Sequence, residues 1–224
     1  MNHVVAPRQL VLALDHAESF AREDFLAGPS NAAALALIDN WPDWPDRIMA
    51  LVGPEGSGKT HLASVWAETA GARVLGAKLL EHGDLPAALA TGALVLEDLE
   101  PDDLDEPALF HLLNLAREER AYVLITARAA PATFPVTIRD LESRLRAISV
   151  VTLAAPDDAL LRSLIVKLAA DRQLAVDEAL VNYLANRIER SFAAARAAVM
   201  RLDEEAMRQH RPVTRALATE LFRA

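Results

Sequence analysis

The feature that most constrains the fold is a glycine-rich stretch, Gly53-Pro54-Glu55-Gly56-Ser57-Gly58-Lys59-Thr60. It matches in full the pattern G-x-x-x-x-G-K-[ST], in which glycines let backbone N–H groups converge on phosphate oxygens. An apolar run precedes the stretch and a helical pattern follows it, which is the context that this pattern requires. The sequence therefore predicts a P-loop that holds the phosphates of ATP or ADP. The alternative is a chance glycine-rich turn.

Residues in this stretch and just after it should bind the phosphates of a nucleotide and its Mg²⁺ ion. Lys59 should reach the β- and γ-phosphates, and the Thr60 hydroxyl should ligate Mg²⁺. A helix that starts near Thr60 adds the positive end of its dipole to the site. We therefore count all eight residues of the stretch, and His61 after it, as nucleotide-binding.

Acidic residues follow a second apolar run, in Leu94-Val95-Leu96-Glu97-Asp98. One carboxylate would hold Mg²⁺, directly or through water, and the next could polarise the attacking water. The alternative is a pair of solvated acids after a strand. Thr126 ends a third run and is the candidate sensor of the γ-phosphate, although a β-branched residue often simply ends a strand.

Five short apolar runs recur through the first two thirds of the chain, at residues 49–52, 72–75, 94–96, 122–126 and 150–153. Helical patterns separate most of them, which implies a parallel sheet covered by helices on both faces. After Pro156 the apolar residues recur only at helical spacing. We predict an α/β fold with a five-stranded parallel sheet and a C-terminal helical lid. The expected divisions are a tail (1–20), a core (21–155) and the lid (156–224).

Composition argues against several classes of function and of binding site. The 224 residues carry a formal net charge of −9, whereas a dedicated DNA-binding protein usually has a basic stripe. The absence of cysteine excludes disulfides and thiolate metal sites. We see no signal peptide and no apolar run of membrane-spanning length, so a soluble cytoplasmic protein is expected.

Four blocks in order resemble the AAA+ module of DnaA-type bacterial replication initiators, and within that group the short regulators of the Hda type. They are Asp24–Asn31, Gly58–Leu62, Glu97–Glu100 and Leu141–Leu145, and the similarity covers nearly the whole chain. Such initiators continue into a basic helix-turn-helix domain that reads DNA. This sequence ends at Ala224, which, with its acidic charge, favours a regulator without direct sequence-specific DNA binding.

The resemblance implies two partners. The segment Gln9-Leu10-Val11-Leu12-Ala13-Leu14 is similar to the Q-L-x-L-x-L peptide that binds the sliding clamp of DNA polymerase, its β subunit. Gln9 would donate or accept a hydrogen bond while Leu10, Leu12 and Leu14 enter an apolar pocket; a strand at the sheet edge is the alternative. Arg144 is the implied arginine finger, inserted into the ATP site of DnaA to trigger hydrolysis. The alternative is a surface arginine in a salt bridge.

Three positions depart from the family pattern. Ala193 stands where the family has a sensor arginine, and Arg190 and Arg196, one turn away on either side, are possible substitutes. Arg128 replaces an acidic sensor, and Glu97 replaces an aspartate. These departures favour a nucleotide-dependent activator of the ATPase of DnaA over a fast ATPase.

Alternatives are a self-standing P-loop ATPase or small-molecule kinase, and an AAA+ protein that binds DNA. The resemblance also suggests head-to-tail contacts or a homodimer. The sequence leaves open whether ADP or ATP is bound in the active state.

Overall fold

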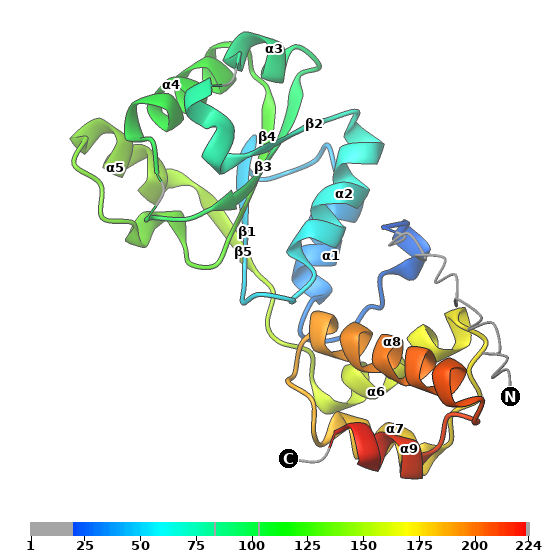
Figure 1. Cartoon of the computed structure of the whole chain (residues 1–224). Coiled ribbons are helices and arrows are strands. Elements are labelled where there is room, and N and C mark those ends of the chain that lie inside the picture. The colour runs from blue at the N-terminus through cyan, green and yellow to red at the C-terminus, as the bar shows by residue number, and fades with distance from the viewer. Residues whose placement is uncertain (1–19, 83, 103, 223–224) are drawn as a thin grey trace, which may run out of the picture.

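The computed structural model describes residues 20–82, 84–102 and 104–222, and it contains a parallel five-stranded sheet with helices on both faces (Figure 1). The strands are β1 (Ile48–Val52), β2 (Arg73–Gly76), β3 (Ala93–Leu99), β4 (Tyr122–Ala127) and β5 (Ser149–Thr152). Their order is β2-β3-β4-β1-β5, so β1 lies between β4 and β5. The predicted five-stranded parallel sheet is confirmed.

Strand β1 shows why polar alternation is missing from the sequence. All five of its residues are buried. Ile48, Ala50 and Val52 pack into the apolar cluster on one face of the sheet, and Met49 and Leu51 pack into the cluster on the other. Because side chains alternate between faces and both faces are covered, every position is apolar.

In the described part of the chain, five helices cover the sheet, and three short 3₁₀ segments lie in the connections. They are α1 (Ala32–Asp39), α2 (Lys59–Ala70), α3 (Leu85–Leu89), α4 (Glu106–Glu118) and α5 (Arg139–Ala147), with η1 (Arg22–Asp24), η2 (Ala77–His82) and η3 (Pro131–Thr133). Helices α1 and α2 cover one face, and α3, α4 and α5 cover the other. The loop after β1 therefore leads into a helix packed on the sheet, as a phosphate loop requires.

The C-terminal third is a helical unit, called the lid below, as predicted. It consists of α6 (Asp158–Asp171), α7 (Glu178–Ala185), α8 (Phe192–Gln209) and α9 (Arg215–Leu221). Each helix begins at a side chain that accepts a hydrogen bond from a first-turn N–H, namely Asp157, Asp177, Ser191 and Thr214. The four helices enclose an apolar cluster of their own.

The segment before α1 joins the lid to the core. The Phe25 ring stacks on the Phe192 ring of α8 with their centroids 6.2 Å apart. Asp24 pairs with Lys167 of α6 at 2.7 Å. In the part of the chain that the structure describes, no helix is long and apolar enough to cross a membrane.

Candidate functional site

The predicted phosphate loop lies between the end of β1 and the start of α2. Gly56 and Gly58 have φ values of 68° and 96°, which L side chains rarely adopt. At Gly53 a β-carbon would lie 2.4 Å from the carbonyl oxygen of Leu153. Ser57 is buried, and its hydroxyl has no partner among residues 20–82, 84–102 and 104–222. This loop, with an orphaned hydroxyl and the amino end of α2 beside it, fits a phosphate group.

Lys59, the first residue of α2, is buried. Its Nζ donates to the carbonyl oxygen of Gly53 at 2.8 Å and to that of Pro54 at 2.9 Å. Burial lowers the pKa of the Lys59 ammonium, and nearby charge, with Asp98 contributing most, partly opposes that shift. Both carbonyl oxygens are neutral, so a bound phosphate would give the Lys59 ammonium an anionic partner.

Two of the predicted magnesium ligands, Thr60 and Glu97, come together. Burial raises the pKa of Glu97, the charge of Asp98 adds to the rise, and a hydrogen bond from Thr60 opposes it. Within the described ranges no group of three or more histidine or carboxylate side chains could hold a metal ion. Mg²⁺ commonly takes one or two carboxylates together with nucleotide phosphates and water. Thr60 and Glu97 therefore fit an ion that arrives with a nucleotide.

Thr126 ties the ends of β3 and β4 together. Its fully buried hydroxyl accepts a hydrogen bond from the Asp98 N–H at 2.9 Å. Asp98 has a φ of 54° and lies within an irregularity of the β3–β4 pairing between Leu96 and Leu99. The residue predicted to sense phosphate thus holds the backbone of the predicted catalytic aspartate, and its contact with a nucleotide stays a prediction.

His61 lies against the segment before α1. Its Nε2 is 3.0 Å from the carbonyl oxygen of Ala21, and its ring makes edge contacts with Phe20 and Phe25. Burial lowers the pKa of His61. Phe25 also approaches the loop, since a β-carbon on Gly58 would lie 3.1 Å from its ring. Phe25 has no predicted role, although it lies in one of the family-like blocks.

The lid touches the phosphate loop directly at Gly56. The Phe192 N–H donates to the Gly56 carbonyl oxygen at 2.8 Å. A β-carbon on Gly56 would lie 3.0 Å from that of Ser191 and 3.1 Å from that of Ala193. Ala193, where the family has its sensor arginine, therefore stands against the loop.

Arg190 is placed differently from the prediction. Helix α8 begins at Phe192 with Ser191 as its cap, so Arg190 precedes the helix. Its guanidinium pairs with Asp158 of α6 at 2.8 Å. The expectation that Arg190 lies one helical turn before Ala193 is wrong, because the serine cap starts the helix after Arg190.

Arg144 lies on α5, on the side of the core opposite to α2. Its guanidinium carbon is 5.1 Å from the centroid of the Phe110 ring. Its Nε is buried without a hydrogen-bond partner in the described part of the chain. The side chain lines a small cavity together with Asp46 and Ile48, at the amino end of β1. The other predicted partner-binding residues, Gln9, Leu10, Leu12 and Leu14, lie outside the described residues.

No established family profile matches the chain. A comparison of amino-acid sequences finds two related proteins. The chain is 24% identical over 231 residues to the chromosomal replication initiator DnaA of Thermomicrobium roseum, covering 90% of itself and 49% of that protein. It thus spans about half the length of that initiator. It is 25% identical to an uncharacterized protein of Haemophilus influenzae, covering 92% of itself and 95% of that protein.

Comparison of structures gives DnaA again. Domain III of Thermotoga maritima DnaA matches with a TM-score of 0.71 and 19% identity, over 90% of this chain and 95% of that one. AMPPCP-bound DnaA from Aquifex aeolicus matches with a TM-score of 0.68 and 17% identity, over 85% and 68%. The chain is DnaA-related, with the AAA+ fold of DnaA domain III.

This DnaA-related chain also shares its fold with a different AAA+ protein. A point mutant of Thermotoga maritima RuvB matches with a TM-score of 0.67 and 16% identity, over 85% of this chain and 67% of that one. At that identity the likeness concerns the fold alone.

Proposed function

We propose that this protein binds ATP or ADP and limits replication initiation by stimulating ATP hydrolysis in the site of DnaA. It acts while bound to the sliding clamp of DNA polymerase, in the bacterial cytoplasm. The observation that carries the proposal is the position of Arg144 relative to the chain's own phosphate loop.

Arg144 and the phosphate loop lie at opposite ends of β1. The cavity that Arg144 lines includes Ile48, the first residue of β1, whereas the loop begins at Gly53, after the last one. A strand rises about 3.3 Å per residue, so these ends are separated by about 16 Å. An arginine side chain does not bridge that distance. If Arg144 contacts a γ-phosphate, it contacts one in a neighbouring AAA+ subunit, which suits an activator in trans.

Nucleotide binding rests on the loop itself. Lys59 would hold the β-phosphate region, Ser57 has an unsatisfied buried hydroxyl, and Thr60 with Glu97 would hold Mg²⁺. The bound nucleotide supplies phosphate charge that the loop N–H groups neutralise. The AMPPCP-bound state of the related Aquifex DnaA supports the same use of this fold.

We expect the protein alone to hydrolyse ATP slowly because of a residue in the lid. Ala193 offers no charge to a γ-phosphate at the position where the family has its sensor arginine. Arginine fingers contribute about 10³–10⁵ in rate in analogous phosphoryl transfer. We infer that the nucleotide here sets the shape of the protein while the hydrolysis that matters takes place in DnaA.

Clamp binding completes the proposal and rests on the sequence of the tail. Gln9, Leu10, Leu12 and Leu14 form the clamp-like peptide, which would bring the protein to replicated DNA. DnaA and the clamp are thus the proposed partners, with head-to-tail AAA+ contacts between Arg144 and DnaA.

The experiment is a mixture of this protein, DNA-loaded clamp and ATP-bound DnaA, with phosphate release followed over time. Wild type should accelerate release, and Arg144→Ala should remove the acceleration. Arg146→Ala is the matched control, because Arg146 lies on the same helix and is exposed in a pair with Glu142. Loss of stimulation in both variants, or in neither, would contradict the role of Arg144.

A further inference from the structure

Arg128 lies between two carboxylates at the phosphate end of the sheet. It is the first residue after β4, and its Nη2 is 3.2 Å from Oε2 of Glu55. Its Nε is 3.2 Å from Oε1 of Glu100, which follows β3. Glu55 itself belongs to the phosphate loop. One guanidinium therefore links the loop to the end of a neighbouring strand.

The backbone fixes Arg128 close to the loop. The Gly53 N–H donates to the carbonyl oxygen of Ala127 at 3.2 Å, so the first loop residue is bonded to the residue before Arg128. The hydrogen bond from the Asp98 N–H to Thr126 holds the end of β3 against the end of β4. The backbone at Arg128 is thus anchored, while its guanidinium can change partners.

The surroundings of Lys59 place the same charges near the phosphate site. Asp98, Arg128, Glu100 and Glu55 all act on the Lys59 ammonium through their charge. A group that binds Lys59 is therefore also within reach of the charge of Arg128 and of the carboxylates that act on Lys59. A terminal phosphate would be such a group.

The ion pair between Arg128 and Glu55 is weak enough to exchange. The side chains of Arg128 and Glu55 are 61% and 79% exposed, and exposed pairs of this kind contribute little to stability. The planar guanidinium suits phosphate oxygens, and a terminal phosphate carries more negative charge than one carboxylate. A phosphate oxygen would therefore pair with the Arg128 guanidinium more strongly than the Glu55 carboxylate does.

We propose that Arg128 distinguishes nucleoside triphosphates from diphosphates by exchanging the Glu55 carboxylate for the terminal phosphate of a triphosphate. With a diphosphate bound, Arg128 stays on Glu55 and the loop keeps the present arrangement. Glu55 is then an internal competitor that lowers the affinity for triphosphates. This inference rests on the proposed binding of nucleotides at the loop, and it adds a residue that sets which nucleotide is preferred.

The test measures the affinities of the purified full chain for ADP and for AMPPCP, with Mg²⁺ present, by displacement of a fluorescent ADP analogue. Arg128→Ala should weaken AMPPCP binding about tenfold and leave ADP binding within about twofold. Glu55→Gln should do the opposite and strengthen AMPPCP binding by up to about fivefold, because it removes the competing charge. Arg128→Lys should fall between wild type and Arg128→Ala, since it keeps the charge but loses the planar fork.

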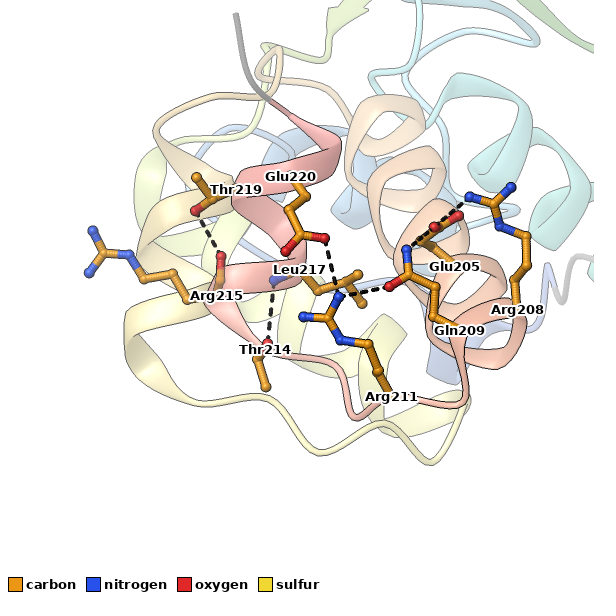
Figure 2. A network of polar contacts seen from close by, with 9 residues as sticks. All are labelled: Glu205, Arg208, Gln209, Arg211, Thr214, Arg215, Leu217, Thr219 and Glu220. Atoms are coloured by element: carbon orange, nitrogen blue, oxygen red, sulfur yellow. Dashed lines mark hydrogen bonds and ion pairs between the residues drawn. The ribbon is translucent and has the colours of Figure 1, made fainter.

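Arg208→Ala is the matched control. Arg208 is 74% exposed and pairs with Glu205 in a polar network of the lid (Figure 2). It lies near the end of α8, whereas the contact with Gly56 is made by the first residue of that helix. This variant should bind both nucleotides as wild type does. Equal weakening of ADP and AMPPCP by Arg128→Ala, or no change in either, would overturn the inference while leaving nucleotide binding in place. A wild-type chain that binds neither nucleotide would overturn both.

Discussion

Replacing Gly56 by alanine tests whether the lid packs directly on the phosphate loop. Gly56 has a φ of 68°, where an L side chain costs about 1–2 kcal/mol. The new β-carbon would also lie 3.0 Å from that of Ser191 and 3.1 Å from that of Ala193, both closer than ordinary contact. Crowding of this kind adds about 1–3 kcal/mol. The two costs together give a loss of about 2–5 kcal/mol in the free energy of unfolding.

The assay is thermal unfolding without nucleotide, followed by circular dichroism. In a chain of this size 1 kcal/mol corresponds to about 2–4 °C, so Gly56→Ala should lower Tm by about 4–20 °C. Gly71→Ala isolates the backbone cost. Gly71 has a φ of 62° but nothing lies within 4 Å of its added β-carbon, so its Tm should fall by only about 2–8 °C. Equal falls in Tm for the two variants would mean that the added β-carbon does not crowd the lid. That result would contradict direct packing of the lid on the phosphate loop.

Three further predictions concern the histidine, the metal and the tail. Burial lowers the pKa of His61, so the stability it contributes is complete above the ordinary histidine pKa of about 6.5 and is lost as pH falls through the lowered value. Between about pH 7.5 and pH 5 the Tm of wild type should therefore fall further than that of His61→Gln, and parallel curves would contradict this. Chelation of Mg²⁺ by EDTA should weaken AMPPCP binding, because Glu55, Glu97 and Asp98 repel the phosphates; unchanged affinity would argue against a metal at Thr60 and Glu97. Gln9→Ala should abolish capture of the protein by immobilised clamp while nucleotide binding persists, and retained capture would remove the case for the tail.

The core could be predicted because its signals are local. Each strand is a short apolar run, and most runs are followed by a helix with its own cap or breaker. The glycine pattern likewise predicts the loop, since the positive φ values at Gly56 and Gly58 are a property of single positions. Strand order is different. Nothing in the spacing of the runs says that β1 inserts between β4 and β5, because that order depends on packing across the whole sheet.

The sequence does not predict contacts in the site between residues that are far apart along the chain. The local pattern does not reveal that the Thr126 hydroxyl accepts a hydrogen bond from the N–H of Asp98, 28 residues earlier in the chain. Arg128 could be recognised as a departure from the family pattern, but its pairing with Glu55 depends on β1 and β4 being neighbours. The expected helical position of Arg190 is wrong for a local reason, since Ser191 caps α8 and excludes Arg190 from the helix.

A single-turnover experiment shows whether Arg144 acts on a nucleotide bound to DnaA. DnaA is loaded with ATP labelled at the γ-phosphate, free nucleotide is removed, and this protein is added with DNA-loaded clamp and unlabelled ADP. We expect rapid conversion of DnaA-bound ATP to ADP with wild type and with Arg146→Ala. With Arg144→Ala we expect no conversion beyond the rate of DnaA alone. Conversion by Arg144→Ala at the wild-type rate would contradict this role of Arg144.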